Sequence, residues 1–166
     1  MIYKDCCNGN KLLLIMEYYN KIANGYDELY MDEQLEKVNV ILKNIKPKGV
    51  LLDIGAGSGI STKLFERFCT CIALDPSEEL LKKYDGFKMI GKAEELPFPD
   101  NYFDVIISVT VLHHCDIEKA LKEIFKVAKK DAQIALTILK KSKVDLNLFK
   151  DFKKIDAGKD WLFVKK

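Results

Sequence analysis

LLDIGAGSG, residues 51–59, decides the fold of this chain together with CIALDPS, residues 71–77. The first apolar run ends at an acid, Asp53. Three glycines then follow at alternate positions: Gly55, Gly57 and Gly59. Glycine adopts positive φ at little cost and has no side chain, so a ligand can lie directly on the backbone of such a turn. The pattern predicts a buried parallel strand that passes into a helix beneath a bound ligand.

A second acid belongs to the same βα unit. Asp75 ends the apolar run CIALD and lies 20 residues after Gly55. An acid at the tip of the second strand can accept hydrogen bonds from both ribose hydroxyls of a nucleoside. Ile60 stands where the dinucleotide fingerprint G-x-G-x-x-G would have its third glycine, which disfavours a dehydrogenase. The two segments therefore predict a site for an adenosine-containing cofactor other than a dinucleotide.

The pattern D-x-G-x-G-x-G at residues 53–59 resembles motif I of the class I S-adenosylmethionine-dependent methyltransferases. Further segments are similar, in order, to the ubiquinone/menaquinone-biosynthesis-type (methyltransferase type 11-like) branch of that superfamily. They are YYNKIANGYD at 18–27, GKAEELPFPDNYFDVIISVTVLHH at 91–114 and IEKALKEIFKVAKKDAQIALTI at 117–138. The resemblance covers most of the chain, from about Tyr18 to Leu139, and implies a methyltransferase with S-adenosylmethionine as its cofactor.

Helical and strand patterns alternate along the chain. Helices are expected within 11–46, broken at Asn24-Gly25, then at 60–68, after an N-cap at Ser77, and at 116–130, with a short helical stretch at 146–149. Strands are expected at 50–54, 71–74, 87–90, 103–108 and 134–139, followed by a hairpin that turns at Ala157-Gly158. This order predicts an α/β fold with a doubly wound, mostly parallel seven-stranded sheet, the Rossmann-like methyltransferase fold, and a C-terminal antiparallel hairpin. A single domain is expected over 1–166, with 1–46 as a helical cover and 47–166 as the cofactor-binding core.

The resemblance also implies a set of cofactor contacts. Asp53 is expected to meet the methionine ammonium, directly or through water, and Asp75 to meet the ribose. Backbone contact is expected from the turn residues Gly55, Ala56, Gly57 and Gly59. The remaining expected contacts are Tyr19, Tyr26, Pro76, Ala93, Glu94 and Ser108. For Tyr19 and Tyr26, which resemble an aromatic cover over the cofactor, ordinary helix packing is the alternative.

Three positions near the expected cleft bear on chemistry and on adenine recognition. His113 and His114 follow the fourth expected strand. Because an imidazole can act as a general base near neutral pH, His114 is the candidate catalytic residue. A structural role is the alternative. Lys92 replaces a short polar residue of the family, and its ammonium cannot accept a hydrogen bond from the adenine amino group. Glu94 or a backbone carbonyl is then expected to accept it. No C-x-x-C pair is present and no metal site is predicted.

Charge is distributed unevenly along the chain. The net charge is +2, but residues 117–166 hold 14 lysines against 7 acids, whereas the rest holds 13 basic and 18 acidic residues. This basic third favours a polyanionic substrate such as RNA, and a solvated lysine-rich surface is the alternative. LLLIMEYY, residues 12–19, is too short to cross a bilayer and no cleavage site follows it, so a cytoplasmic location is expected, with no membrane partner.

The acceptor is the open question. Methyl transfer by in-line displacement mainly requires an acceptor atom held close and aligned. Methyltransferases acting on small metabolites usually close the cleft with a lid, and here only residues 140–151 lie between the fifth strand and the hairpin. The leading hypothesis is therefore a methyltransferase for a macromolecule, RNA or protein, with a small activating protein subunit as a candidate partner. The alternatives are a small-metabolite (quinone-precursor-like) methyltransferase and a non-catalytic cofactor-binding scaffold subunit.

Overall fold

The structure, a computed structural model, describes residues 28–166, with side chains from Asp32 onward. The helix expected before Asn24, and the predicted contacts Tyr19 and Tyr26, lie outside the described residues. The chain divides into compact units of residues 1–34 and 35–166, and the second unit contains the whole sheet. Within the described part, no helix is long and apolar enough to span a bilayer.

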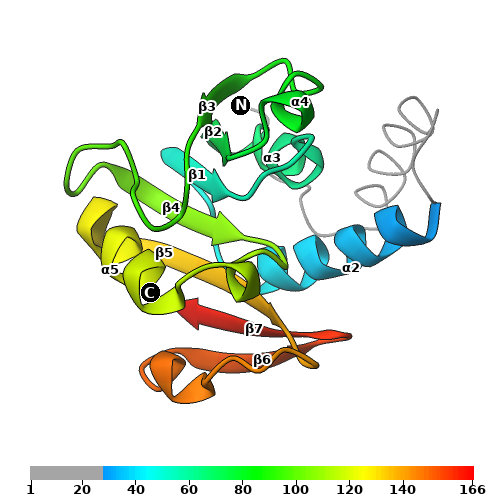
Figure 1. Cartoon of the computed structure of the whole chain (residues 1–166), viewed down its shortest axis with the longest axis vertical. Helices are drawn as coiled ribbons and strands as arrows, with labels where there is room; N and C mark the ends of the chain where they lie inside the picture. The colour runs from blue at the N-terminus through cyan, green and yellow to red at the C-terminus, as the bar shows by residue number, and fades with distance from the viewer. Residues whose placement is uncertain (1–27) are drawn as a thin grey trace, which may run out of the picture. The chain divides into compact units, whose positions relative to one another are not determined.

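One seven-stranded sheet runs through the second unit in the order β3-β2-β1-β4-β5-β7-β6 (Figure 1). The first five strands along the chain are parallel, and β7 pairs antiparallel with both β5 and β6. The bounds are β1 Val50–Ile54, β2 Thr70–Asp75, β3 Phe87–Ile90, β4 Phe103–Ser108, β5 Ala128–Leu139, β6 Lys153–Ala157 and β7 Asp160–Lys165. The doubly wound sheet with a C-terminal antiparallel hairpin is confirmed.

Four helices and two 3-10 segments connect the strands in the described part of the chain. They are α2 Glu28–Asn44, α3 Ile60–Phe65, α4 Glu78–Leu81, η1 Leu112–His114, α5 Ile117–Val127 and η2 Leu146–Phe149. The predicted N-cap of α4 is confirmed, because the Ser77 hydroxyl accepts a hydrogen bond from the Leu80 amide at 3.3 Å. Such a cap satisfies one of the unpaired amides at the start of the helix.

The junction between α5 and β5 differs from the expectation. The sequence predicts a helix to residue 130, a turn and a strand from 134, whereas α5 ends at Val127 and β5 begins at the next residue. Ala128 pairs with Phe103 on β4, and the register between β4 and β5 shifts before Val105 pairs with Gln133. This early pairing with β4 extends the strand through the segment expected to turn.

The carboxyl ends of the strands are where this topology places a ligand. The chain order reverses between β1 and β4, which are neighbours in the sheet. In open α/β sheets, ligands bind outside the carboxyl ends of the strands at such a switch point. One buried cluster joins the apolar side of α5 to the sheet through residues such as Leu52, Ile106, Ile124, Leu136 and Phe163. This core holds the ends of β1, β2 and β4 in fixed positions around the switch point.

Candidate cofactor site

A cavity of about 430 Å³ lies at the carboxyl ends of β1 and β2 and beside η1. Its volume is in the range of small-molecule sites, roughly 300–1,000 Å³. Six residues predicted from the sequence line it: Gly55, Asp75, Pro76, Ala93, Glu94 and His114. They come from four separate segments of the chain, which the sheet brings together. Val111 and Cys115 also line the cavity and were not predicted, although both lie in the segment that follows β4.

The glycine-rich turn leaves one wall of the site without side chains. Gly55 and Gly57 have φ values of +73° and +56°, which glycine adopts far more readily than other residues. A Cβ atom at Gly55 would lie 2.4 Å from Cγ1 of Val111, so the turn packs tightly against the segment after β4. At Gly57 the nearest atom to a Cβ would be Cδ1 of Leu80, at 3.9 Å. The backbone at Gly57 therefore borders open space that a ligand can occupy.

Asp75 is held at the edge of the cavity by two backbone amides. The Gly57 amide donates to its Oδ2 at 2.9 Å and the Ser77 amide donates to its Oδ1 at 2.8 Å. The side chain is 7% exposed and lines the cavity. A carboxylate offers about four acceptor positions, so capacity for two further hydrogen bonds remains. This arrangement suits a carboxylate that accepts from a pair of ribose hydroxyls.

Asp53 lies beneath the turn and does not line the cavity. It is fully buried, and the hydroxyls of Ser61 and Thr62 both donate to its Oδ2 at 2.7 Å. Its Oδ1 is buried without a hydrogen-bond partner in the described part of the chain. Burial raises the pKa of the Asp53 carboxyl to about 6, against the lowering effect of the two hydroxyls. A buried carboxyl with a raised pKa and one unpartnered oxygen is a group whose ionised form a cationic ligand can stabilise.

Replacing Asp53 by asparagine is expected to stabilise the ligand-free protein at alkaline pH. The pKa of Asp53 is higher in the folded protein than in the unfolded chain, so the folded state binds the proton more tightly. The free energy of unfolding therefore falls as the pH rises from about 4 to about 6, and it stays lower above pH 6. A pKa raised to about 6 corresponds to a cost of ionisation of about 3 kcal/mol in the folded state. Asp53→Asn should raise the free energy of unfolding at pH 8 by about 1–3 kcal/mol and should flatten its change between pH 4 and 8, as measured by urea unfolding. An unchanged value at pH 8 would contradict this account.

Three other predicted contacts point into the protein. Ala56 belongs to a small buried cluster with Ala73, Leu81 and Tyr84. A Cβ atom at Gly59 would lie 2.4 Å from the Tyr84 ring, and the buried Ser108 hydroxyl donates to the Ile54 carbonyl at 2.9 Å. In this structure, these residues fix the shape of the turn and the ends of β1 and β4.

Glu94 and Lys92 occupy the side of the cavity expected to hold the adenine. Oε1 of Glu94 accepts a hydrogen bond from the Asp116 amide at 3.1 Å, which ties the cavity to the N-terminus of α5. Its Oε2 is then the oxygen available to accept from an adenine amino group. Lys92 also lines the cavity and forms an isolated bridge with Glu95. Acceptance of a hydrogen bond from the adenine by Glu94 or a backbone carbonyl stays a prediction.

A buried polar network supports the wall formed by the segment after β4. Lys37 of α2 is 1% exposed, and its ammonium donates to the Thr110 hydroxyl at 2.8 Å. That hydroxyl donates to Oδ2 of Asp160 at 2.7 Å, and Oδ1 of Asp160 lies 3.2 Å from the Lys37 ammonium. The Thr110 amide donates to the Thr137 hydroxyl at 2.7 Å. The sequence alone did not predict this network. Lys37 is one of many lysines, and Asp160 closely follows the expected hairpin turn, so neither residue has a sequence signal of burial.

Thr110 has a strained backbone that the network maintains. Its φ is +60°, which is unfavourable for a β-branched residue and costs roughly 1–3 kcal/mol. The next residue, Val111, packs against the Gly55 turn and lines the cavity. The hydrogen bonds to Thr110 therefore set the direction of the chain where it enters the wall of the site.

The network can be tested by separating the shape of Thr110 from its hydroxyl. Thr110→Val keeps the branched side chain but leaves Lys37 and Asp160 without the hydroxyl between them, and should lower the free energy of unfolding by about 1–3 kcal/mol. Amides 111–115 should also exchange with solvent faster than in the unmodified protein. Thr110→Ser keeps the hydroxyl and should behave like the unmodified protein in urea unfolding and hydrogen exchange. Equal effects of both substitutions would show that the hydroxyl is unimportant.

A second cavity, of about 440 Å³, lies at the opposite end of the strands. Cys69, Cys71, Tyr84 and Phe87 line it at the amino ends of β2 and β3. Burial raises the pKa of the Cys69 thiol to about 11, and the Tyr84 hydroxyl donates to Glu66 at 2.6 Å. A thiol with a raised pKa is unreactive at neutral pH, and ligands of these sheets bind at the carboxyl ends. The first cavity is therefore the candidate site.

Comparisons with known proteins identify the family of the chain. Residues 52–136, just over half of the chain, match the methyltransferase domain family. The chain is 32% identical over 127 residues to the uncharacterized methyltransferase YcgJ of Bacillus subtilis, covering 66% of this chain and 50% of that protein. The crystal structure of YcgJ superposes with a TM-score of 0.59 at 27% identity, covering 69% of this chain and 56% of that chain.

Two further similarities bear on function and partners. The C-methyltransferase UbiE of ubiquinone and menaquinone biosynthesis from Rickettsia bellii is 29% identical over 182 residues, covering 92% of this chain and 70% of that protein. A Haloferax volcanii methyltransferase crystallised in complex with the Trm112 methyltransferase activator has a TM-score of 0.62 at 21% identity, covering 70% of this chain and 57% of that chain. At that identity the likeness shows the fold alone.

The family match covers the segment that builds the site. This chain spans about half the length of the first curated relatives that it matches. Residues 52–136 nevertheless include Asp53, the glycine-rich turn, Asp75, Glu94 and His114, which the sheet assembles around the switch point. The chain therefore belongs to the class I S-adenosylmethionine-dependent methyltransferase family.

Proposed function

We propose that this chain transfers a methyl group from S-adenosylmethionine to a macromolecular acceptor, RNA or protein. The observation that carries the proposal is the cavity at the carboxyl ends of the strands, which is lined by Asp75, the carboxylate that accepts from the Gly57 amide. The donor set fits the cofactor: a carboxylate with spare acceptor capacity suits a ribose, and the bare turn leaves room for the ligand. The unpartnered Oδ1 of Asp53 adds a negative group beneath the turn.

Each residue of the site has a proposed task in binding. Asp75 would accept from the ribose hydroxyls and Oε2 of Glu94 from the adenine amino group, while Pro76 and Ala93 supply apolar contact. The backbone of residues 55–59 would border the ribose and methionine parts, with the Asp53 carboxylate offsetting the charge of the ammonium. When bound, S-adenosylmethionine supplies a sulfonium methyl group that is already electrophilic. The protein's contribution is then mainly to hold the acceptor aligned in a site that excludes water.

His114 is the candidate general base of the reaction. It lies on η1, is exposed and lines the cavity, which places an imidazole at the edge of the site. If it removes a proton from an oxygen or nitrogen acceptor, His114→Ala should lower kcat by about 10²–10⁴-fold, a typical contribution of a positioned base. S-Adenosylhomocysteine affinity should change much less. Nearly full turnover of the variant on a verified acceptor would remove this role.

The proposed single domain extends beyond the described residues. Residues 1–46 are proposed to cover the cofactor, with Tyr19 and Tyr26 over its methionine end, and residues 47–166 to form the core. The division of the chain at residues 34 and 35 falls inside α2 rather than after it. Substituting Tyr19 and Tyr26 by leucine and measuring cofactor affinity would test the cover.

The preference for a macromolecular acceptor rests on the connection after β5. In the described part of the chain, only residues 140–152 with the short η2 separate β5 from β6. A connection of this length offers little material for a lid, and lids are what enzymes use to enclose small substrates. An activating protein subunit is a further proposal, supported by the Haloferax volcanii neighbour, which was crystallised with a methyltransferase activator.

A small-metabolite acceptor is the second candidate function. The relative UbiE, whose name refers to ubiquinone and menaquinone biosynthesis, aligns with 92% of this chain and favours it. The two candidates differ in the expected acceptor site, because a quinone precursor needs an apolar pocket beside Tyr19, Tyr26 and His114. A non-catalytic cofactor-binding scaffold is the third hypothesis, and it differs from the first two in predicting cofactor binding without turnover.

Calorimetric titration of the purified chain tests the proposal. S-Adenosylmethionine and S-adenosylhomocysteine should bind with micromolar dissociation constants, and NAD should not bind. Turnover with tritiated methyl donor on RNA, protein and quinone-precursor fractions would then identify the acceptor class. Absence of cofactor binding by the chain alone and in the presence of a co-purified partner would overturn the enzyme proposal. Cofactor binding without turnover on any of these fractions would favour the scaffold.

A further inference from the structure

We propose that Lys140, Lys154 and Trp161 form a phosphate clamp that holds the backbone of an RNA acceptor next to the cofactor site. This inference rests on the proposed methyl transfer and specifies its acceptor. The clamp lies at the hairpin of β6 and β7, a surface that the cofactor site does not use.

Two lysine ammonium groups converge on one aromatic ring. Nζ of Lys154 lies 3.8 Å and Nζ of Lys140 lies 4.3 Å from the centroid of the Trp161 ring. Cation–π attraction of this kind is worth about 0.5–1 kcal/mol at exposed sites. It restrains two long side chains that would otherwise lose conformational entropy on binding a ligand. The ring therefore preorganises two positive charges at one place on the surface.

The local charge is not balanced. Asp156 is the carboxylate at this cluster, and its Oδ2 accepts from the Lys140 ammonium at 2.8 Å. Residues 139–166 contain nine lysines and four aspartates. One of those aspartates, Asp160, is fully buried and paired with Lys37, so it does not offset the charge of the surface. The segment 139–166, which includes the β6–β7 hairpin, thus has an excess of positive charge, which suits a polyanion.

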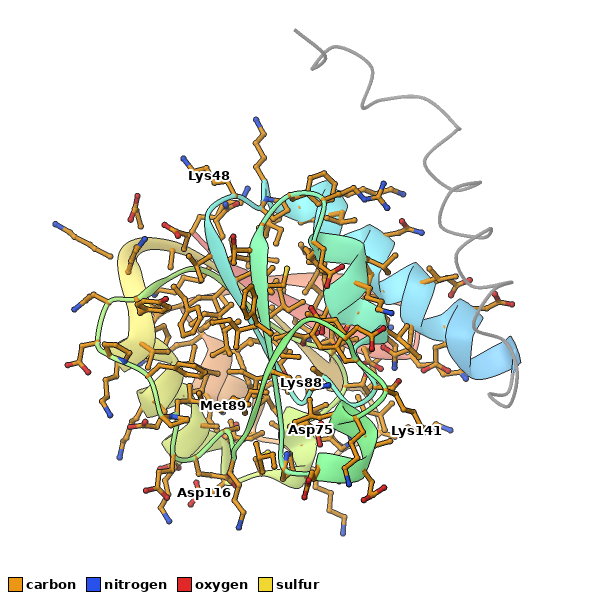
Figure 2. The ribbon with its side chains drawn as sticks, turned by 90° about the horizontal axis from the view of Figure 1, so that it is seen from above. Lys48, Asp75, Lys88, Met89, Asp116 and Lys141 are labelled. Atoms are coloured by element: carbon orange, nitrogen blue, oxygen red, sulfur yellow. The ribbon has the colours of Figure 1, made fainter. Side chains whose placement is uncertain are left out.

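The clamp and the cofactor cavity both lie on the side of the sheet where the parallel strands have their carboxyl ends. Trp161 pairs with Ile138 near the carboxyl end of β5, and β5 is the neighbour of β4. The residue before Trp161 is Asp160, which binds the Thr110 hydroxyl just ahead of the cavity wall. Asp75 of the cofactor site and Lys141, directly after Lys140, lie towards the same side of the molecule in Figure 2. A strand bound at the clamp can therefore extend over the site.

The chemistry of the clamp favours a nucleic-acid backbone. Lysine binds phosphate as a point charge, without the bidentate geometry of arginine. The clamp would therefore recognise the charge of the RNA backbone and not the base sequence. Contacts of this kind position a nucleic acid and leave the choice of base to other residues. RNA is therefore the acceptor class that fits the clamp. Binding of an acidic polypeptide is the alternative that the experiment must distinguish.

Fluorescence of the single tryptophan provides a direct test. Trp161 is the only tryptophan in the chain, so a change in its emission reports binding at the clamp. The full-length chain is titrated with a 15-nucleotide single-stranded RNA of mixed sequence and, separately, with poly-glutamate, at several salt concentrations. RNA should quench the emission in a saturable manner. Lys140→Gln/Lys154→Gln should weaken binding at least tenfold and lower the slope of log affinity against log salt by about 1.4.

A matched double variant controls for the loss of two charges. Lys46 and Lys48 are exposed and precede β1 at the amino ends of the strands, so Lys46→Gln/Lys48→Gln removes the same charge at the end opposite to the cofactor cavity and the clamp. This variant should bind RNA within about twofold of the unmodified chain. Equal weakening by both double variants, or quenching by poly-glutamate and not by RNA, would overturn the proposal. Titration of each protein with S-adenosylhomocysteine keeps the two proposals apart, because loss of the RNA result with intact cofactor binding rejects only the clamp.

Discussion

Replacing Gly57 by valine is expected to abolish binding of S-adenosylhomocysteine while the protein remains folded. A Cβ atom at this position meets no protein atom closer than Cδ1 of Leu80, at 3.9 Å, so we expect the valine side chain to project into the open space beside Asp75. The space that the ligand needs would then be filled by the valine. We expect at least a 100-fold loss of affinity, about 2.7 kcal/mol, by calorimetry.

Gly158 provides the matched control for this substitution. It has a φ of +73°, close to the +56° of Gly57, and a Cβ there would meet nothing within 4 Å. Valine at either position bears a similar cost of the left-handed conformation, about 1–2 kcal/mol, but Gly158 lies at the turn of the β6–β7 hairpin. Gly158→Val should lose stability and keep its affinity. Tight binding by Gly57→Val would show that the ligand does not lie on the turn.

Replacing Asp75 by alanine should weaken S-adenosylhomocysteine binding by about 10–100-fold. The carboxylate lines the cavity and has capacity for two hydrogen bonds beyond those from Gly57 and Ser77. Loss of hydrogen bonds to a charged group is worth about 1.5–3 kcal/mol, which corresponds to that range. Titration calorimetry on the folded variant measures the effect.

Asp104 provides a control variant that separates a change in cofactor affinity from a change in stability. Its carboxylate also accepts from a backbone amide, that of Val50 at 2.8 Å, and pairs with Lys129, but at the amino ends of the strands. Asp104→Ala should therefore destabilise the protein without changing cofactor affinity. If Asp75→Ala binds within about twofold of the unmodified chain, the ribose assignment is wrong.

The strands could be predicted because their signals are local, whereas the order of the strands in the sheet comes from the structure. The run before Asp53 and the run before Asp75 are apolar and bounded by turn residues, and β1 appears at the predicted residues 50–54. The start of β5 could not be predicted in this way. Ala128 enters the strand because it pairs with Phe103, and no residue near 128 marks that register.

The candidate site also has features that could be predicted from the sequence and features that could not. The motif order was enough to predict that Gly55, Asp75, Glu94 and His114 would meet, because each follows a strand or turn whose place in the sheet is known from the pattern. Motif order could not show that Asp53 is sealed beneath the turn with a raised pKa. That property depends on the hydroxyls and the apolar atoms packed around it.

The sequence by itself determined the family, the parallel sheet and the glycine turn, because periodicity and positive φ are properties of neighbouring residues. Only the tertiary structure decided which distant groups meet. Lys37 reaches Thr110 across 73 positions of the chain, and Thr110 reaches Asp160 across 50. Burial makes such contacts strong because water no longer competes for the hydrogen bonds, and burial is created by the packing of the whole fold.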